Sequence, residues 1–357
     1  KKKMKHNQKF FKGSKYLPVD SFFENVLYDN QFGYYKTKKP FGLDGDFITS
    51  PKVSNLFSEI IAIWLINTWE NFGKPKKFNL VELGPGDGSL AKTLLNIFKK
   101  FPEFNSAKKI HLYEKSNYLK KVQKRKIADK CVKWIKDFNN IKDGPVIFFG
   151  NEFLDAIPIK QFRKKNGSFF EKNYILNKNF DIEETYRKAS KINSRILKSY
   201  LSIKDLNFIE FPKLGFQNLK KITKKILKLE GCILLIDYGY LRPHNENTLQ
   251  SVLKHKKNKL LDNLGKADVT SHINFELLKE FFKKNNLKTK KIVTQQEFLK
   301  RNGIIERAEI LAKKMKFRDQ SDLYLRLKRL LHPKLMGTLF KVALAYNSEN
   351  RNFNGFN

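Results

Sequence analysis

The sequence predicts an α/β fold built around a mostly parallel sheet. Three observations support this prediction: short apolar runs that each suit one buried strand, a glycine-rich turn directly after the first such run, and a helix-periodic segment after the turn. The chain has 357 residues, enough for one large domain or two smaller ones with a substantial core.

The fold is predicted to start from the strand at residues 78–83. Gly84, Gly86 and Gly88 follow it, and apolar residues then recur at helical spacing up to Phe98. Three glycines in five residues let the backbone turn sharply and let a ligand approach it closely. The new helix would point its free amides and the positive end of its dipole at that ligand.

The spacing of the glycines bears on which ligand is bound. A dinucleotide fold has the pattern G-x-G-x-x-G, whereas the third glycine here comes one residue early and Ser89 follows it. Glu82 and Asp87 flank the glycines; carboxylates repel a pyrophosphate but attract an ammonium and a sulfonium. The pattern therefore favours S-adenosylmethionine, with S-adenosylhomocysteine as product. A structural turn without a ligand is the alternative.

Two further acids follow the next predicted strands. Glu114 ends the apolar run 110–113, where a carboxylate can accept both hydroxyls of a ribose. Asp137 follows the strand predicted at 131–135, a position suited to holding an adenine amino group. Both are expected to bind the cofactor.

A long loop precedes the first strand. It follows a short helix predicted at 19–27 and contains Gly45, Asp46, Thr49 and Ser50. A loop of this length without its own helix or strand is often functional. Thr49 or Ser50 is also placed to cap the helix expected at 53–71, so a purely structural turn is the alternative.

The apolar strand predicted at 145–149 ends in a polar segment that contains Asn151, Glu152 and Asp155. Ligands of open parallel sheets bind at the carboxyl ends of strands. Carboxylates placed next to a core lose hydration, and a site that must hold a cation gives a reason for that cost. The alternative is that Asn151 and Asp155 cap a helix while Glu152 faces solvent.

The second half of the chain mixes helices with strands. A buried strand at 232–237 again ends in an acid, Asp237, and residues 242–265 have the composition of a lid loop. The remaining expected elements are a hairpin at 161–176 turning at Asn166-Gly167, helices at 181–201, 214–229, 275–282 and 296–331, and a last strand at 336–345. The predicted domains are an N-terminal helical extension (1–75), a sheet domain (76–347) with insertions at about 160–215 and 240–330, and a flexible tail (348–357).

The net charge is +37, from 72 basic and 35 acidic residues. Most of the excess is lysine spread along the chain, and arginine, the usual reader of bases and phosphates, is scarce, so nucleic acid is not the expected partner. No apolar run reaches the roughly 20 residues that span a bilayer, and no signal-peptide core follows the basic start. Cys131 and Cys232 lie in apolar runs and show no metal-ligand spacing, so no metal is expected. A reducing compartment is expected: the bacterial cytoplasm or, alternatively, the mitochondrial matrix.

Several blocks, taken together and in order, resemble the MidA-like family. They are Gly33-Tyr34-Tyr35, residues 45–51, 82–88 and 151–158, Ile236-Asp237-Tyr238-Gly239, Thr248-Leu249-Gln250, residues 268–272 and 336–341. Two departures are Asp87, where arginine is common, and Ser58, where the family usually has glycine. The family includes a mitochondrial assembly factor that methylates a protein arginine of respiratory complex I. The resemblance implies a Rossmann-like class I methyltransferase with a seven-stranded, mostly parallel sheet.

The resemblance also implies roles for the residues named above. Glu82 and the glycine turn would hold the methionyl end of S-adenosylmethionine, with Asn151 and the loop of Gly45, Thr49 and Ser50 beside it. Glu152 and Asp155, then Asp46 and Asp237, are the expected grip on an arginine guanidinium. The implied partner is a protein, a subunit of respiratory NADH dehydrogenase. Methylation of RNA or a small molecule, a non-catalytic assembly chaperone, and a homodimer are left open.

Overall fold

The computed structural model describes residues 2–37 and 50–356, which form two compact units. Unit 1 comprises Lys1–Phe47, Leu154–Leu219 and Tyr240–Phe281, and unit 2 comprises Ile48–Phe153, Lys220–Gly239 and Phe282–Asn357. Residues 48–75, expected in an N-terminal extension, thus fall in unit 2.

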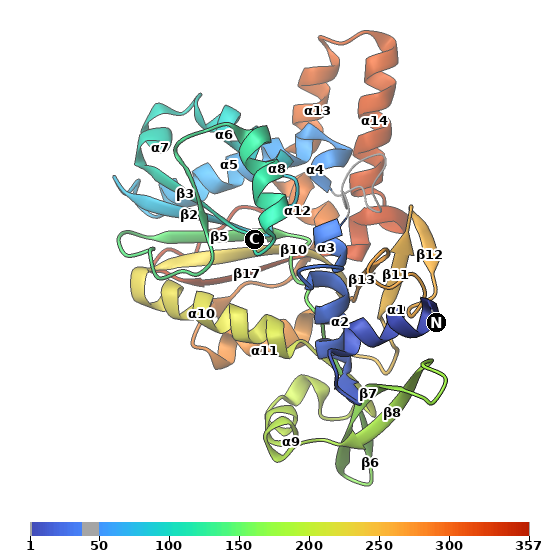
Figure 1. Ribbon diagram of the computed structural model, residues 1–357. Coiled ribbons are helices and arrows are strands. Elements are labelled where there is room, and N and C mark those ends of the chain that lie inside the picture. Colours follow the sequence, from blue (N-terminus) through green and yellow to red (C-terminus); the bar gives the residue numbers. More distant parts are fainter. Residues whose placement is uncertain (1, 38–49, 357) are drawn as a thin grey trace. The chain divides into compact units, whose positions relative to one another are not determined.

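The main sheet belongs to unit 2 and confirms the predicted α/β class (Figure 1). Its continuous path runs β15 (Lys288–Thr289), β17 (Phe340–Asn347), β10 (Gly231–Tyr240), β5 (Val146–Asn151), β2 (Phe78–Leu83), β3 (Lys108–Tyr113) and β4 (Val132–Ile135). Neighbours from β10 to β4 are parallel, and β17 is antiparallel to β10. The sheet has nine strands rather than seven, because the two-residue strands β14 (Ile273–Asn274) and β16 (Val293–Thr294) lie off this path.

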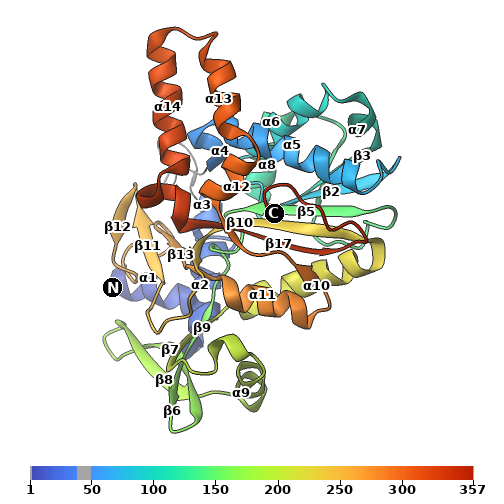
Figure 2. The ribbon, with the colours of Figure 1, turned by 180° about the vertical axis from the view of Figure 1, so that it is seen from behind.

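Helices complete unit 2, and α13 and α14 run side by side as a helical hairpin (Figures 1 and 2). The helices are α4 (Ser50–Val53), α5 (Asn55–Asn71), α6 (Ser89–Phe98), α7 (Pro102–Ala107), α8 (Asn117–Ile127), α12 (Gln295–Arg301), α13 (Ile304–Ala312), α14 (Phe317–Leu331) and η2 (Pro333–Gly337). The expected cap of α5 is wrong: the Oγ atom of Ser54 accepts the bond from Leu56 N at 3.2 Å.

The C-terminal segment is not the frayed tail that its polar composition suggests. Phe353 and Phe356 are 1% and 6% exposed and belong to the core of unit 2. The indole Nε1 of Trp64 donates to Asn354 O at 3.0 Å. Burial of two phenylalanines stabilises the segment by roughly 1.5–3 kcal/mol for each ring, which outweighs the entropy of a short polar stretch.

Unit 1 holds two smaller antiparallel sheets. The first has the order β1-β7-β6-β9 with β8 on β7, and the second has the order β12-β11-β13. The expected hairpin is confirmed, since Lys165 pairs with Ser168 across a two-residue turn at Asn166 and Gly167, whose φ angles are 47° and 72°. The strands are β1 (Tyr16–Pro18), β6 (Lys160–Lys165), β7 (Ser168–Leu176), β8 (Ile182–Lys188), β9 (Phe208–Phe211), β11 (Gln250–Leu253), β12 (Lys256–Asn258) and β13 (Asp268–Thr270).

The helices of unit 1 include the short amphipathic one predicted near residue 19. They are α1 (Lys2–Phe11), α2 (Val19–Tyr28), α3 (Tyr34–Thr37), α9 (Lys191–Lys198), η1 (Leu201–Ile203) and most of α11 (Phe275–Lys284), while α10 (Lys213–Leu229) contributes to both units.

Three expectations are wrong, two of them in unit 1 and one in unit 2. The helix predicted at 181–201 begins as strand β8, because pairing with β7 decides the conformation of a segment whose own pattern is weak. The supposed lid loop contains β11 and β12. Cys131, expected in a buried run, is exposed.

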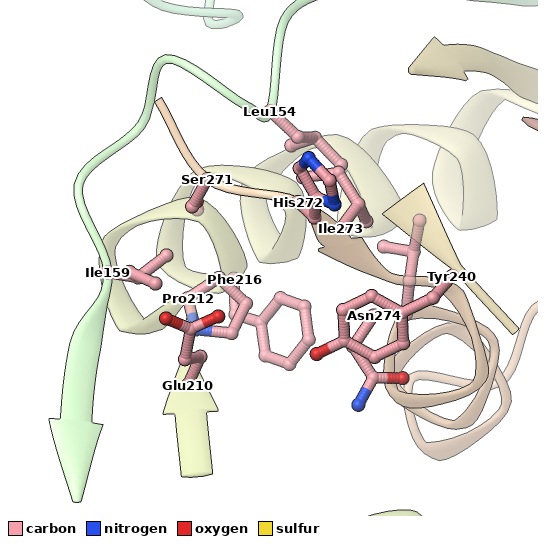
Figure 3. A pocket seen from close by; sticks show the side chains of 12 residues that line it. Leu154, Ile159, Glu210, Pro212, Phe216, Tyr240, Ser271, His272, Ile273 and Asn274 are labelled. Atoms are coloured by element: carbon pink, nitrogen blue, oxygen red, sulfur yellow. The ribbon is translucent and has the colours of Figure 1, made fainter. Parts of the chain in front are cut away.

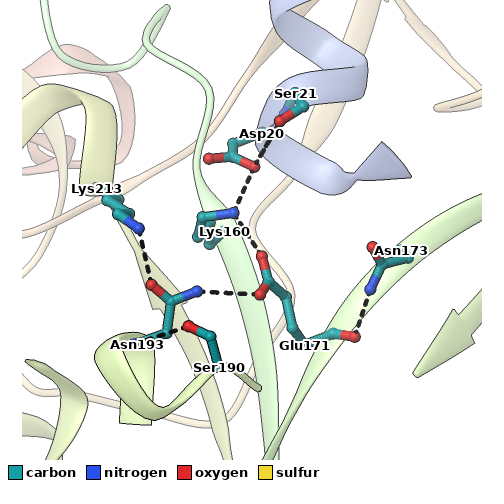
Figure 4. Close-up of polar contacts among 8 residues, drawn as sticks. All are labelled: Asp20, Ser21, Lys160, Glu171, Asn173, Ser190, Asn193 and Lys213. Carbon is teal, nitrogen blue, oxygen red and sulfur yellow. Dashed lines mark hydrogen bonds and ion pairs between the residues drawn. The ribbon is translucent and has the colours of Figure 1, made fainter. Parts of the chain in front are cut away.

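A buried group of charges ties several elements of unit 1 together (Figure 4). The Nζ atom of Lys160 lies 2.9 Å from Asp20 Oδ1 and also contacts Glu171 Oε1. Asn193 Nδ2 donates to Glu171 Oε2 at 3.1 Å, and Lys213 Nζ donates to Asn193 Oδ1 at 2.8 Å. Burial opposes the charge on Lys160, but the two carboxylates outweigh burial and raise its pKa.

Candidate active site

The glycine turn connects β2 to α6 as the sequence predicts. Gly84, Gly86 and Gly88 have φ angles of 64°, 56° and 80°, which residues other than glycine rarely adopt. Gly84 N donates to Tyr113 O at 3.1 Å, which fixes the turn to the adjacent strand β3. The bend that leads into the first turn of α6 is therefore held in place by the sheet.

Glu82 lies on β2, two residues before the first glycine, and is 2% exposed. Its Oε2 atom is buried and accepts no hydrogen bond from any residue in the described ranges. Burial, assisted by the negative charge of Asp87, raises the pKa of Glu82 to about 8. A buried carboxyl group with an unused acceptor fits a cationic ligand, and the ammonium of S-adenosylmethionine is such a group.

Asp87 does not share this role, although the sequence argument treated the two acids together. Its Oδ2 atom lies 2.7 Å from Lys126 Nζ, and its Oδ1 atom accepts from Ser89 N at 3.0 Å. Asp87 therefore closes the first turn of α6 and pairs with a lysine of α8, and Glu82 remains the acid suited to the ligand.

Gln123 of α8 is a site residue that sequence reasoning missed. It is fully buried, and its Nε2 atom donates to Gly86 O at 2.7 Å and to Glu114 Oε2 at 3.1 Å. Its Oε1 atom accepts from the indole of Trp134 at 2.9 Å. The sequence does carry a signal for it: Gln123 is a polar residue four positions from both Leu119 and Ile127, so it shares the apolar face of the helix.

Glu114 and Asp137, the two acids expected at the ribose and the adenine, differ in burial. Glu114 is 8% exposed, and burial raises its pKa although Ser116 N donates to its Oε1 at 2.7 Å. Asp137 is exposed and accepts from Asn139 N at 2.8 Å. Burial raises the pKa of Tyr113, and the charges of Glu114 and Asp137 raise it further, which places both acids close to that ring.

The carboxyl ends of β2 and β5 lie almost level in the sheet, beside the middle of the longer strand β10. Glu82 pairs with Phe149, so Gly84 is level with Asn151, and Asn151 in turn pairs with Ile236. Asp237 is the next residue of β10; it is 1% exposed and its Oδ1 accepts from Tyr238 N at 2.9 Å. The glycine turn, Asn151 and Asp237 therefore lie close to the same level of the sheet.

Glu152 directly follows β5 in a strained conformation. Its φ is 53°, and its backbone N donates to Ile236 O at 2.8 Å. Its Oε1 atom accepts from Asn151 Nδ2 at 3.0 Å and from Ser50 N at 3.3 Å. A residue of this type in the left-handed region costs roughly 1–3 kcal/mol, and such outliers concentrate at active sites.

The remaining predicted site residues lie either in unit 1 or outside the described residues. Asp155 belongs to unit 1, is 7% exposed, and its backbone oxygen accepts from Ser271 N at 3.1 Å. Gly45, Asp46 and Thr49 lie outside the described residues. Hydrogen bonds thus connect Gly86 with Glu114 through Gln123 and, separately, Ser50 and Asn151 with Glu152, while Glu82 lies two residues before the glycine turn.

Two kinds of feature are absent from the described part of the chain. Its histidines, cysteines and acids form no group of three that could hold a metal ion. Within the same residues, no helix combines the length and the apolarity that crossing a bilayer requires.

Comparisons with known proteins agree with this geometry. A family profile described as "Putative S-adenosyl-L-methionine-dependent methyltransferase" matches residues 60–293. The chain is 31% identical over 321 residues to the "Protein arginine methyltransferase NDUFAF7 homolog, mitochondrial" of Caenorhabditis elegans, covering 81% of this chain and 74% of that protein. It is 25% identical to the human "Protein arginine methyltransferase NDUFAF7, mitochondrial", over 91% of this chain and 78% of the human protein.

A solved structure shares the fold. It is described as a COG1565 superfamily member and likely methyl transferase from Burkholderia thailandensis bound to S-adenosyl-homocysteine. The similarity covers 100% of this chain and 94% of that one, with a TM-score of 0.80 and 19% sequence identity.

Proposed function

Because the chain belongs to the family of S-adenosyl-L-methionine-dependent methyltransferases, we propose that it transfers the methyl group of that cofactor to an arginine side chain of a protein. The observation that carries the arginine assignment is the similarity, over most of both chains, to proteins named as protein arginine methyltransferases. The charge and position of the residues at the carboxyl ends of β2 and β5 support it.

We propose that Glu82 holds the cationic methionyl end of the cofactor, and that Glu114 and Asp137 hold the ribose and the adenine. The unused buried acceptor of Glu82 and the open backbone at Gly84, Gly86 and Gly88 suit that arrangement. Gly45, Thr49, Ser50 and Asn151 complete this proposed site. When bound, the cofactor would supply a methyl group on a sulfonium: a nucleophile bonds to the methyl carbon in line with the carbon–sulfur bond, which breaks and releases S-adenosylhomocysteine.

An arginine acceptor sets a specific requirement. Its guanidinium has a pKa above about 12, so it enters the site as a delocalised cation. A carboxylate that grips two of its nitrogens can localise the charge there and leave the third nitrogen nucleophilic. We propose Glu152 for this grip, with Asp155, Asp46 and Asp237 as the other acids. Support comes from the rigid placement of Glu152 by Ile236 O and Ser50 N.

The proposed acceptor is the quinone-site subunit of respiratory NADH dehydrogenase, whose methylation would support assembly of that complex. The reaction would take place in the bacterial cytoplasm or, as the names of the relatives suggest, in mitochondria. A homodimer remains part of this proposal and is tested by light scattering of the purified protein.

The proposal is tested by mass spectrometry of that subunit from cells with and without the gene. An arginine that gains one or two methyl groups only when the gene is present is the expected result. Incubation of the unmodified subunit with the purified protein and labelled S-adenosylmethionine should restore the modification. Label found in RNA or a small molecule, or cofactor binding without any transfer, would contradict the proposal.

A further inference from the structure

Unit 1 contains an open polar groove of about 690 Å³, a volume typical of ligand sites, which span roughly 300–1,000 Å³. It is formed by residues 244–260, within the segment that the sequence predicted as a lid, together with His272. The lining residues that matter here are Thr248, Gln250, Lys257, Asn258, Lys259 and His272. Two of the blocks that carry the family resemblance, Thr248-Leu249-Gln250 and residues 268–272, thus meet in one groove.

The wall of the groove is held in place by partly buried hydrogen bonds. The hydroxyl of Thr248 donates to Glu210 Oε2, and Thr248 N donates to Glu210 Oε1 at 3.1 Å. The same hydroxyl oxygen accepts from His272 N at 3.0 Å. Glu210 is 8% exposed. These bonds make the groove a preformed surface rather than a mobile loop.

The groove is directly connected to one of the proposed acceptor-binding acids within the same unit. Ser271 N donates to Asp155 O at 3.1 Å, and the next residue, His272, lines the groove. A peptide whose arginine is held at Asp155 would therefore place its flanking residues over His272 and Thr248.

The chemistry of the lining suits a peptide with acidic side chains. Gln250 carries an amide oxygen that can accept from a peptide backbone, whereas the side chains of Thr248 and Asn258 already bond within the unit and shape the groove. Lys257 and Lys259 are exposed, and no ion pair with another described residue engages them, whereas the one acid among the groove residues is Glu246. The lining therefore carries a net positive charge.

We propose that this groove binds the segment of the acceptor protein that flanks the target arginine, with acidic side chains of that segment paired to Lys257 and Lys259. The inference rests on the proposed function and specifies how the acceptor is chosen. Long-range attraction between opposite charges would also orient the acceptor as it arrives.

A second cavity in unit 1 is too small for this role (Figure 3). It is lined by Glu210, Phe216, Tyr240 and Asn274 among others, and its volume of about 20 Å³ suits one water molecule. It shares His272 and Glu210 with the wall just described and supports that wall from within the unit.

The test compares a double charge reversal in the groove with a single reversal at a lysine that does not line it. Lys257→Glu with Lys259→Glu reverses both lysines of the groove, whereas the control Lys256→Glu reverses the charge of the preceding residue, which is not among the groove residues. The probe is the quinone-site subunit, whose concentration is varied while labelled S-adenosylmethionine is held at a fixed, saturating concentration. The double variant should raise KM for the subunit about tenfold, which corresponds to two weak surface pairs, without changing kcat or cofactor affinity. Lys256→Glu should leave KM unchanged.

The outcomes separate the groove from the wider proposal. If the wild type methylates the subunit on arginine and both variants have the wild-type KM, the groove assignment is overturned and the proposed function stands. If kcat or cofactor affinity falls instead of KM rising, the residues act elsewhere and the assignment is overturned as well. If the wild type methylates no protein, both are overturned.

Discussion

The side-chain amide of Gln123 donates to the backbone oxygen of Gly86 at 2.7 Å. The same nitrogen reaches Glu114 at 3.1 Å, so one helix residue connects the proposed methionyl-binding turn to the proposed ribose-binding acid. A substitution of Gln123 is therefore expected to disturb the positions of both the glycine turn and Glu114.

Gln123→Met keeps the volume of the side chain but removes its hydrogen bonds. Because Gly86 O, Glu114 and Trp134 would each lose a buried partner, we expect a loss of about 1–3 kcal/mol of stability and weaker binding of S-adenosylhomocysteine. Urea unfolding and calorimetric titration measure the two effects. Lys121→Met, at an exposed residue of the same helix, should change neither. A variant that unfolds and binds like the wild type would show that the network is dispensable.

Glu82→Gln tests the electrostatics of the turn through pH. The native pKa of Glu82 is about 8, raised from an ordinary 4.5, so the native state holds a proton that the unfolded chain releases within this window. Wild-type stability should therefore fall as pH rises from about 4.5 through about 8, and the fall should be smaller in the variant. We expect the variant to be the more stable of the two at pH 8 in the absence of ligand, but to bind S-adenosylhomocysteine less tightly. Parallel pH profiles of unfolding free energy would count against the buried, protonated carboxyl.

Glu152→Gln retains the shape of the side chain and its contact with Ser50 N but removes its charge. Cofactor binding should persist, while transfer to the acceptor should fall by about 100-fold or more, as for other groups that act on a charge in the transition state. Single-turnover assays and calorimetry separate the two. Normal methylation by this variant would remove Glu152 from the proposed grip.

Gly86→Val places a β-branched side chain at a φ of 56°. The matched control is Gly73→Val, where φ is 80° and no atom lies within 4 Å of the added Cβ. Both should lose roughly 1–2 kcal/mol of stability from backbone strain. Only Gly86→Val should abolish binding of S-adenosylhomocysteine, and equal affinities in calorimetry would refute the placement of the cofactor.

Lys160→Met breaks the buried charge group of unit 1. With the lysine removed, Asp20 and Glu171 remain buried near one another, and a loss of about 3–5 kcal/mol is expected in urea unfolding. Adding Asp20→Asn and Glu171→Gln should recover most of that loss because no charge is then left unpaired. If the triple variant is no more stable than the single one, packing rather than charge explains the effect.

Local patterns predicted the parts of the structure that local forces determine. The strand at 78–83 and the helix at 19–27, which the structure extends to Tyr28, were found from periodicity, and the turn at Asn166-Gly167 from its residue types. The segment at 182–188 was misread because its pairing with β7 outweighs its own weak preference.

The site was predicted less completely than the fold. Acids at the ends of strands are visible in the sequence, but their partners are not. The pairing of Asp87 with Lys126, which are 39 residues apart, and the bridge made by Gln123 depend on how α8 packs. Only tertiary structure could therefore separate Glu82, with its unused oxygen, from Asp87, which a lysine already neutralises.

The position of β17 has a consequence for synthesis of the chain. This strand pairs along almost the whole of β10, yet it is synthesised about a hundred residues later. While the ribosome is still translating, the apolar edge at Cys232–Ile236 lacks its neighbour and is open to pairing with other nascent chains. A chaperone that shields this edge until β17 has been synthesised would therefore increase the amount of correctly folded protein.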